Sequence, residues 1–414
     1  MLQRGLLAAL LCLAAAAQTS ANIANLEASA RQAMKAGNAE GALAAYEKLA
    51  QADPKSAIYE DQIGFLLAAT KRLPEAIPHL RRATELDPRM AAAWFHLGAA
   101  QWMLQQPDNA VRALQRAVTL APGNAEYRFR LGAAYSDTGH YDEAIAELTA
   151  AAKKSPGNAG VLEALGNAFQ QQHRYKDARN AYRQAVALAP DNDLLRNSYG
   201  LALLNSGSPE AALVEFQRAL RRHPGELRIQ VNVGSAYLAA ARYQDAIRYL
   251  SVLTRAHPGI ASAHYDLGVA YKQTDDLPHA RAELEQAIQL EPTLAEAHYT
   301  LALTYLDLSE TDKAVTQLRA AVEHRPDYAE AWYRLGTVLQ QQEDIDGAIE
   351  ALRRDVALDA SNAGAWNSLG LMLRRKKDAE GAREAFAKAA ALRQAEADQK
   401  AKALRDGAAR EQKP

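Results

Sequence analysis

Apolar residues recur at helical spacing along most of the chain, in pairs of short stretches separated by a polar turn. In residues 331–352, "AWYRLGTVLQQQEDIDGAIEAL", the first stretch carries Trp332 and Leu335 and the second carries Ala348 and Leu352. Spacings of three and four residues predict two amphipathic helices. Neither helix can bury its apolar stripe alone, so the pattern predicts that they pack against each other and against neighbouring pairs.

This paired layout repeats at a fixed interval. Residues 297–318, "AHYTLALTYLDLSETDKAVTQL", show it 34 positions earlier. A glycine holds the same place in the first stretch of most copies. A proline follows the second stretch at the same interval, as Pro54, Pro88, Pro122, Pro156, Pro190, Pro224, Pro258, Pro292 and Pro326. A fixed period of this size is typical of proteins built from stacked structural repeats.

The residues at these fixed places resemble the tetratricopeptide repeat. That repeat has Trp-x-x-Leu-Gly-x-x-Tyr in its first helix, Ala-x-x-x-Phe in its second helix and a proline at its end. One copy in this chain reads Leu131-Gly132-x-x-Tyr135, then Ala144-x-x-x-Leu148. The resemblance implies an all-α fold, a right-handed superhelical solenoid of antiparallel helix pairs.

Eleven copies follow one another in register over residues 23–396, with no linker or inserted domain between them. Each repeat should contact only its neighbours, so the chain is expected to form one elongated array. Two departures predict weak points in this array. Pro78 falls about one turn inside a second helix, where it should kink or loosen that helix. Asp355 stands where most copies have a packed alanine, and burying it there would cost free energy.

The N-terminal segment, residues 1–21 with the sequence "MLQRGLLAALLCLAAAAQTSA", differs from the repeats. Arg4 is followed by an apolar run over residues 5–17 and then by small residues, the order found in secretory signal peptides. We therefore expect a signal peptide over residues 1–21 and an exported protein, periplasmic or secreted, with no stable membrane insertion after cleavage. The alternative is an uncleaved N-terminal membrane anchor, although the run is shorter than the ~20 residues of a spanning helix.

The single cysteine, Cys12, lies inside this apolar run. Leu11 precedes it where a lipidation motif would have a small residue, so the sequence disfavours a lipoprotein. Cleavage of the signal would leave no cysteine for disulfides, thiolate nucleophiles or metal sites.

The C-terminal residues 397–414 are mostly alanine and charged residues. No proline or glycine interrupts residues 382–406, so the last helix of the array can continue into this segment as a charged capping extension. The end of the chain, "GAAREQKP", is expected to be disordered.

Catalytic chemistry finds little support in the sequence. The ten histidines are scattered, and none has the His-Glu-x-x-His spacing of a zinc site. His264 and His298 share one repeat position, but Trp332 occupies the same position, which favours packing over metal binding. We expect no enzymatic activity, metal or other cofactor.

Charge is balanced overall and uneven locally. The formal net charge of −1 does not suit a dedicated nucleic-acid binder. Residues 173–259 carry a net charge of +5, residues 275–360 carry −11, and residues 371–414 carry +5. This distribution is either variation among solvated positions or a bipolar surface that orients a partner of mixed charge.

The resemblance also implies where a ligand would bind, because first helices line the concave face of tetratricopeptide arrays. Aromatic and polar residues at the groove positions are candidates for contact with a peptide. The candidate groove residues are Phe95, Phe129, Asn197, Asn232, Tyr265, Asp266, Tyr299, Tyr333 and Arg334, with His96 and Arg130 beside them. If Tyr299 lines the groove, its loss should weaken binding by roughly 1–3 kcal/mol and change stability little. Otherwise the ring belongs to the core.

The sequence therefore predicts a non-enzymatic scaffold that holds a peptide segment or protein surface in its groove. One alternative is a structural component of an envelope assembly or polysaccharide export machine, and another is an auxiliary binding subunit of a separately encoded enzyme. The carboxylate clamp of co-chaperones matches only in fragments, such as Asn167 and Arg228, and is not carried over. The sequence identifies neither the partner nor the oligomeric state.

Overall fold

The computed structural model describes residues 21–411, with side chains described up to residue 402, and that range is all-helical. Of the expected signal peptide, residues 1–20 lie outside the described residues. The described chain divides after Ser208 into two compact units, called unit 1 and unit 2 below. Among the described helices, none combines the length and the apolar character that a membrane span requires.

Unit 1 begins in a helix that ends at residue 35 and continues as a series of short helices. These are α2 (Ala39–Ala52), α3 (Ala57–Ala69), α4 (Leu73–Leu86), α5 (Ala91–Met103), α6 (Pro107–Leu120), α7 (Ala125–Asp137), α8 (Tyr141–Lys154), α9 (Ala159–Gln171), α10 (Tyr175–Leu188) and α11 (Asp193–Asn205).

Unit 2 repeats the same lengths and ends in one longer helix. Its helices are α12 (Pro209–Arg222), α13 (Leu227–Ala239), α14 (Tyr243–Ala256), α15 (Ala261–Gln273), α16 (Leu277–Leu290), α17 (Ala295–Asp307), α18 (Thr311–His324), α19 (Ala329–Gln341), α20 (Ile345–Leu358), α21 (Ala363–Arg375) and α22 (Ala379–Glu411).

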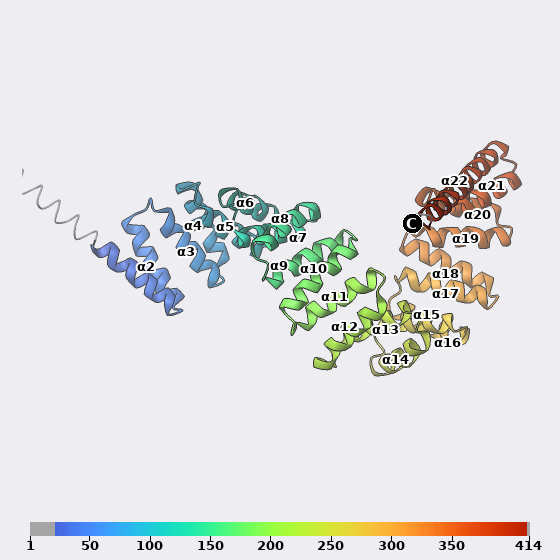
Figure 1. Ribbon diagram of the computed structural model, residues 1–414, viewed down its shortest axis with the longest axis horizontal. Helices are drawn as coiled ribbons and strands as arrows, with labels where there is room; N and C mark the ends of the chain where they lie inside the picture. The colour runs from blue at the N-terminus through green and yellow to red at the C-terminus, as the bar shows by residue number, and fades with distance from the viewer. Residues whose placement is uncertain (1–20, 412–414) are drawn as a thin grey trace, which may run out of the picture. The chain divides into compact units, whose positions relative to one another are not determined.

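Within each unit, every odd-numbered helix packs against the even-numbered helix that follows it (Figure 1). The odd-numbered helices, here called first helices, also contact one another, as α3 with α5 and α13 with α15. The two surfaces of a unit are named accordingly. The first-helix face is formed by the odd-numbered helices and the second-helix face by the even-numbered ones.

Glycine in the first helix lets the second helix approach closely. A Cβ atom added at Gly336 would lie 2.7 Å from Cγ of Leu352, and one added at Gly64 would lie 2.4 Å from Cγ of Leu80. Real Cβ atoms do not come so close, so a larger residue would force the two helices apart. The glycine positions of the sequence repeat thus mark a close contact in the helix pairs that have them, whereas α17 has Ala302 at this position.

The turn inside each pair has a left-handed residue at a constant place. Positive φ angles recur once in each repeat, from Gly37 (71°) to Lys377 (68°). The next residue closes the turn by bonding back five positions, as Arg72 N to Leu67 O at 2.8 Å. This is the Schellman arrangement, which favours glycine at the left-handed position. Glycine nevertheless fills only three of these turns in the described chain, Gly37, Gly139 and Gly207.

A hydrogen bond ties most of the first helices to the end of the preceding repeat. The indole of Trp332 donates to the carbonyl of Pro326, six residues earlier, at 2.9 Å. Nε2 of His264 lies 3.1 Å from the carbonyl of Pro258, so this histidine makes the same contact as the tryptophan. His298 does likewise with its own proline carbonyl at 2.9 Å. The contact explains why most residues at this position, with Glu60 and Leu162 as exceptions, carry a side-chain N–H.

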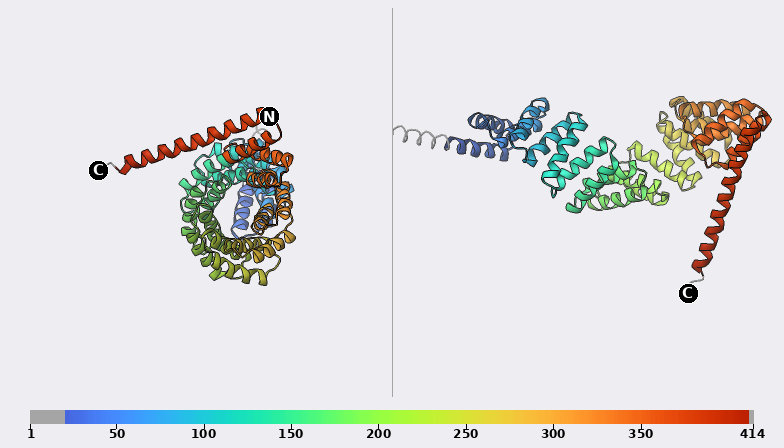
Figure 2. Two further views of the ribbon diagram at one scale, coloured as in Figure 1. Left: turned by 90° about the vertical axis from the view of Figure 1, so that its right-hand side faces the viewer. Right: turned by 90° about the horizontal axis from the view of Figure 1, so that it is seen from above.

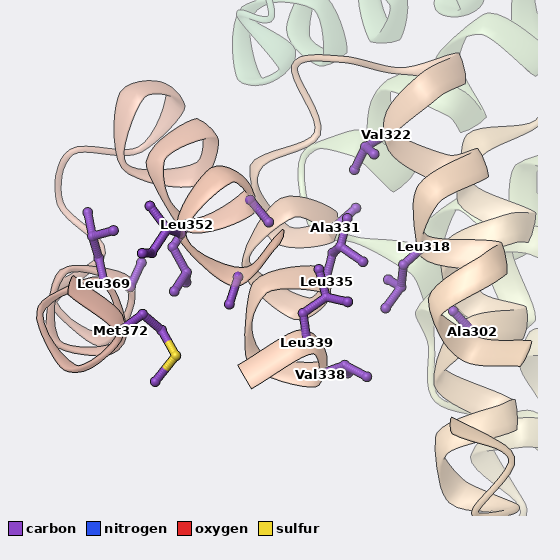
Figure 3. Close-up of a cluster of buried hydrophobic side chains, with 14 of the residues drawn as sticks. Ala302, Leu318, Val322, Ala331, Leu335, Val338, Leu339, Leu352, Leu369 and Met372 are labelled. Atoms are coloured by element: carbon purple, nitrogen blue, oxygen red, sulfur yellow. The ribbon is translucent and has the colours of Figure 1, made fainter. Parts of the chain in front are cut away.

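The largest buried cluster runs through α16 to α22 of unit 2 (Figure 3). Leu318, Leu335, Leu352 and Leu369 come from four successive helices of this stack and are nearly inaccessible to solvent. Each side chain fills space against the neighbouring helix. The stack has no separate central core, and each repeat depends on its neighbours for burial.

Both expected weak points are folded into regular helices. Helix α4 continues through Pro78, which removes one helical hydrogen bond because proline has no amide hydrogen. Asp355 is buried with 1% of its surface exposed, as its register position predicted. Its carboxylate has a partner, because Asn362 Nδ2 donates to Oδ2 at 3.0 Å. Asp355 is therefore a buried and hydrogen-bonded carboxylate.

Helix α22 spans 33 residues and extends beyond the helices it packs against (Figure 2). Its buried residues, Ala382, Ala385 and Ala389, all lie in its first third. From residue 393 to residue 402 the described side chains are exposed. The exposed segment is polar, which suits the solvent-facing end of a repeat array.

Candidate binding pocket on the first-helix face

The first-helix face of unit 1 contains an apolar pocket of about 470 Å³ between α3, α5 and α7. Its lining residues are Phe65, Ala68, Ala69, Lys71, Phe95, His96, Ala99, Ala100, Trp102, Met103, Leu114, Glu126, Arg130 and Ala133. The volume lies within the usual range of ligand pockets, roughly 300–1,000 Å³. We call it the α5 pocket, because α5 supplies most of its walls.

Small residues at one register position create the α5 pocket. Phe65, Ala99 and Ala133 stand one repeat apart and occupy the same place on α3, α5 and α7. The aromatic ring at the first place forms a wall, and the methyl groups at the next two leave space. The pocket is therefore encoded by a local change in residue size within a regular repeat.

Two large apolar residues at the end of α5 form the outer wall. Trp102 is 37% exposed and Met103 is 50% exposed. The indole N–H of Trp102 donates to Oδ2 of Asp137 at 2.6 Å, which fixes the ring against α7. Exposed apolar side chains gathered around a cavity are typical of binding sites.

His96 forms part of the inner wall and rests on a buried carboxylate. Its Nδ1 lies 2.8 Å from Oδ1 of Asp61, whose side chain is almost completely buried. The imidazole centroid is 5.0 Å from the ring of Phe65 and 5.7 Å from that of Phe95. Phe95 in turn stacks on Tyr127 at 4.5 Å. These contacts hold the aromatic wall in a fixed arrangement.

Charged groups stand at the rim of the pocket. Nε of Arg130 lies 2.8 Å from Oε1 of Glu126, one helical turn away on α7. Both side chains of this pair are nearly half exposed, so the ion pair contributes little to stability. Lys71 has no ion pair among the described residues and projects from the left-handed turn after α3. An incoming polar group therefore meets charges that can turn toward it.

The corresponding face of unit 2 is packed with tyrosines. Tyr265, Tyr299 and Tyr333 are half-buried against the large core cluster. The ring of Tyr299 lies 5.0 Å from that of Tyr328, at the start of α19. The guanidinium of Arg325 lies 3.5 Å above the Tyr328 ring. The loop before α19 therefore covers part of the row of tyrosines expected from the sequence.

Tyr328 is also tied to α17 and to its aromatic neighbours. Arg325 pairs with Glu296 of α17 at 2.6 Å, which holds the covering loop in place. Burial raises the pKa of Tyr328 to about 12, with smaller effects from the charge of Arg325 and from Tyr265 and Tyr299. The structure thus brings Tyr265 and Tyr299 together with Tyr328.

Asp266 is a buried carboxylate beside this row. The hydroxyl of Ser235 donates to its Oδ2 at 2.5 Å. Burial raises the pKa of Asp266 to about 6, and the bond from Ser235 opposes this shift. Arg334, which the sequence also assigned to the groove, is exposed on α19. Asp266 consequently belongs to the interior of the repeat stack more than to an open surface.

The remaining candidate groove residues lie elsewhere on the first helices. Phe129 packs against the small core cluster of α8 to α10, with the guanidinium of Arg130 at 5.4 Å from its ring. Asn197 is buried on α11, and Asn232 is half-buried on α13. Of the residues expected to contact a ligand, the α5 pocket gathers Phe95 together with His96 and Arg130.

Sequence reasoning missed Phe65, Trp102 and Met103, which make up much of the pocket wall. Comparing the residues that occupy the position of Met103 in other repeats could have indicated this wall. Three repeats after Met103 the same position holds Asn205, and after a further three repeats it holds Asp307. Two large apolar residues at the end of a first helix are therefore unusual in this chain and mark an exposed apolar surface.

No group of three or more His, Cys, Asp and Glu side chains suited to a metal ion occurs among the described residues. The α5 pocket offers a cavity, apolar walls and charged groups at its rim. These features suit a site that binds a ligand.

Profiles of the tetratricopeptide repeat match the chain at many places. One profile matches residues 63–125, 163–226, 299–363 and 333–399. Two others match residues 102–168, 203–267 and 261–294. These matches cover more than half of the chain, and the protein belongs to the tetratricopeptide repeat family. No curated protein matches the chain.

Three solved structures are similar to this chain to different extents. A tetratricopeptide repeat protein from Parabacteroides merdae ATCC 43184 matches with a TM-score of 0.53 and 15% identity, over 60% of this chain and 98% of that one. MamA from Desulfovibrio magneticus RS-1 is 26% identical over 41% of this chain and 97% of its own, with a TM-score of 0.38. Human IFIT1 is 16% identical over 81% of this chain and 90% of its own, with a TM-score of 0.43. The first likeness shows the fold alone.

Proposed function

We propose that this protein is a scaffold that binds a peptide segment of a partner protein, and that the α5 pocket holds the main anchoring side chain. The tetratricopeptide fold is one of protein–protein interaction. The observation that supports this site is the apolar cavity with exposed Trp102 and Met103 on the first-helix face. Binding energy in such interfaces concentrates where a large side chain fills a dry pocket.

The cavity fits a large apolar side chain, such as leucine, phenylalanine or tryptophan. The alanine methyl groups of the floor offer no hydrogen bonds, and a polar anchor would be desolvated there without compensation. The rim groups Lys71 and Arg130 can meet the backbone carbonyls or side chains that flank the anchor. The partner segment is therefore expected to carry an apolar anchor between polar residues.

Selection from a library of displayed random peptides tests this proposal directly. Residues 22–414 serve as the bait, and Ala99→Phe serves as a second bait with the pocket filled. Phenylalanine is accommodated at the equivalent position Phe65, so the variant should fold. Peptides enriched on the wild type should share a large apolar residue and should not bind the variant. Enrichment of the same peptides on both baits, or no enrichment on either, would overturn the proposal.

We also propose that the chain is exported and acts outside the cytoplasm. The support is Arg4 followed by the apolar run of residues 5–17. N-terminal sequencing of the protein from its own host should begin between Gln18 and Ala24. Intact Met1 on protein recovered from the soluble cytoplasm would refute export.

A further inference from the structure

The second-helix face of unit 2 carries two neighbouring pockets that share a pair of tyrosines. One pocket, of about 520 Å³, runs along α14, and the other, of about 350 Å³, lies between α12 and α14. Tyr237 and Tyr249 line both, with ring centroids 5.9 Å apart. Val252 beside them is 62% exposed. This surface has the aromatic and apolar character of an interface.

Arginines dominate the charge around these tyrosines. Arg248 lines the first pocket and Arg221 lines the second. Arg221 is engaged by no carboxylate among the described residues. We call the two pockets with these residues the basic site.

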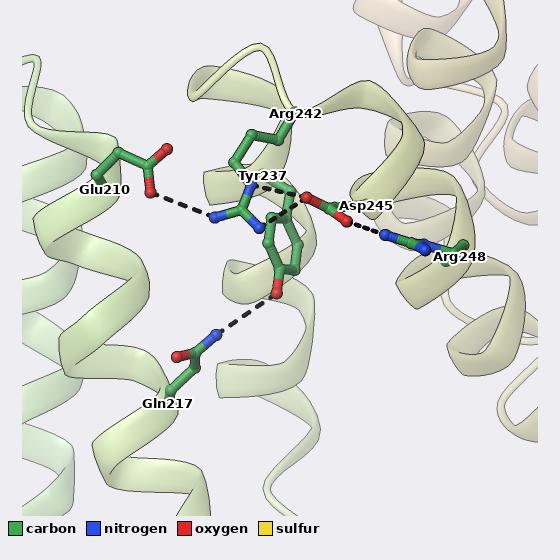
Figure 4. Close-up of polar contacts among 6 residues, drawn as sticks. All are labelled: Glu210, Gln217, Tyr237, Arg242, Asp245 and Arg248. Carbon is green, nitrogen blue, oxygen red and sulfur yellow. Dashed lines mark hydrogen bonds and ion pairs between the residues drawn. The ribbon is translucent and has the colours of Figure 1, made fainter.

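The nearby carboxylates are already engaged (Figure 4). Asp245 pairs with Arg248 and, at 2.7 Å, with Arg242. Arg242 also reaches Glu210 at 3.4 Å. Little negative charge on this surface is left free to offset Arg221.

An equivalent pocket three repeats later has the opposite charge. It measures about 360 Å³ and lies between α18, α19 and α20. Its charged lining residues are Glu323 and Glu350, which hold the repeat positions of Arg221 and Arg248, and Arg319, which holds that of Gln217, so the carboxylates outnumber the one cation. Trp332 supplies an aromatic wall there. We call this pocket the acidic site.

The surrounding segments follow the same division. Residues 209–260 hold seven Arg and Lys against four Asp and Glu, a net charge of +3. Residues 261–360 hold eight against nineteen, a net charge of −11. One unit thus presents two similarly built surfaces of opposite sign on its second helices. Surfaces with complementary potential attract each other and suppress like-charged pairings.

We propose that the basic site of one copy of this protein docks against the acidic site of a second copy. Arg221 and Arg248 meet Glu323 and Glu350 across the contact, and the aromatic and apolar walls bury surface between the charges. The contact is heterologous, because two different patches meet, so each added copy leaves one site of each kind free. This contact uses the second-helix face of unit 2 and leaves the α5 pocket of unit 1 open.

Charge exchange between the two sites tests this proposal. Arg221→Glu with Arg248→Glu gives the basic site the residues of the acidic site, and Glu323→Arg with Glu350→Arg does the converse. Each new residue is already accommodated at the equivalent repeat position, so both variants should fold. The measurement is sedimentation velocity of residues 22–414 over a range of concentrations, at about 20 mM and about 0.5 M NaCl, where screening differs strongly.

The wild type should gain mass with concentration at low salt and return to the monomer at high salt. Each double variant alone should remain monomeric, whereas a mixture of the two should associate again, because every contact in the mixture regains opposite charges. Lys388→Glu with Arg393→Glu, on the exposed side of α22, changes the net charge equally and should associate like the wild type. A monomeric wild type at low salt, variants that associate as well as the wild type, or a mixture that stays monomeric would each overturn the proposal.

Discussion

The first-helix faces of the two units follow one repeat pattern and present different surfaces. In unit 1, alanines at positions 99 and 133 leave the α5 pocket open beneath Trp102. In unit 2, tyrosines at positions 265 and 299 are half-buried under the loop that carries Tyr328. Aromatic residues at groove positions can therefore be part of the packing, and small residues beside exposed aromatics can mark the binding site. Tyr265 and Tyr299 hold the register position of Phe95, whereas Ala99 and Ala133 hold the position four residues later, so neighbouring positions on one helix face together decide between an open surface and a packed one.

Truncation of an aromatic residue on each face should give the largest contrast. Tyr299→Ala removes a half-buried ring that packs on Tyr328, and we expect it to lower the free energy of unfolding by about 2–3 kcal/mol. Phe65→Ala removes a ring from the pocket wall that is 37% exposed, and we expect a loss of about 1 kcal/mol. Urea denaturation measures both changes.

Hydrogen exchange should place the Tyr299 effect in α15 to α19, because a repeat array can open locally. If Tyr299→Ala leaves stability unchanged and instead weakens peptide binding, the row of tyrosines is a ligand surface, as the sequence pattern alone predicts.

Buried carboxylates give the next contrast. In unit 1, Asp61 faces the imidazole of His96, whereas in unit 2 Asp266 and Asp355 have only neutral partners, a serine and an asparagine. Burial raises the pKa of Asp355 to about 6, assisted by the charge of Asp359. Because this pKa exceeds the ~3.9 of the unfolded chain, the folded state binds more protons between these values.

The stability of unit 2 should therefore fall as the pH rises from about 4 to about 6, by up to about 3 kcal/mol for each carboxylate. Asp266→Asn and Asp355→Asn should each flatten this dependence in unfolding experiments from pH 4 to pH 8. The exposed Asp275→Asn serves as the control and should leave it unchanged. A wild-type profile that is flat or rises over this range would show that the two carboxylates are ionised at little cost.

Substitutions in the left-handed turns should cause the smallest changes in stability, and these changes should be similar in size in both units. Ala241 adopts φ of 54° at the place where Gly139 and Gly207 adopt 76° and 78°. Ala241→Gly should raise stability by about 1 kcal/mol, because glycine adopts this conformation without a steric penalty. Gly139→Ala should lower it by a similar amount. Thermal unfolding of the two variants measures both changes in stability. A loss of stability in Ala241→Gly would contradict this account of the turn.

The helices, their pairing and the tight glycine contacts follow directly from the repeat pattern of the sequence, because each repeat fixes its own local packing. The hydrogen bond between Asn362 and Asp355 does not follow from the repeat pattern, because Asn362 lies outside the repeat consensus. The sequence predicted only part of the α5 pocket. Phe95 could be predicted, because it stands at an aromatic position that recurs in the repeats. Trp102 could not, because its importance depends on the neighbouring cavity, which several helices form together.

The affinity of a peptide selected on the wild type, measured by titration calorimetry against Ala99→Phe and Thr337→Phe, tests the central claim most directly. Both positions lie at the same place in their repeats, on α5 of unit 1 and α19 of unit 2, and both variants add a ring to a first-helix face. Filling the α5 pocket should raise the dissociation constant at least about tenfold, or by about 1.4 kcal/mol. The matched change in unit 2 should leave it within about twofold. Equal affinity for the wild type and Ala99→Phe, or a loss only in Thr337→Phe, would contradict the assignment of the binding site to the α5 pocket.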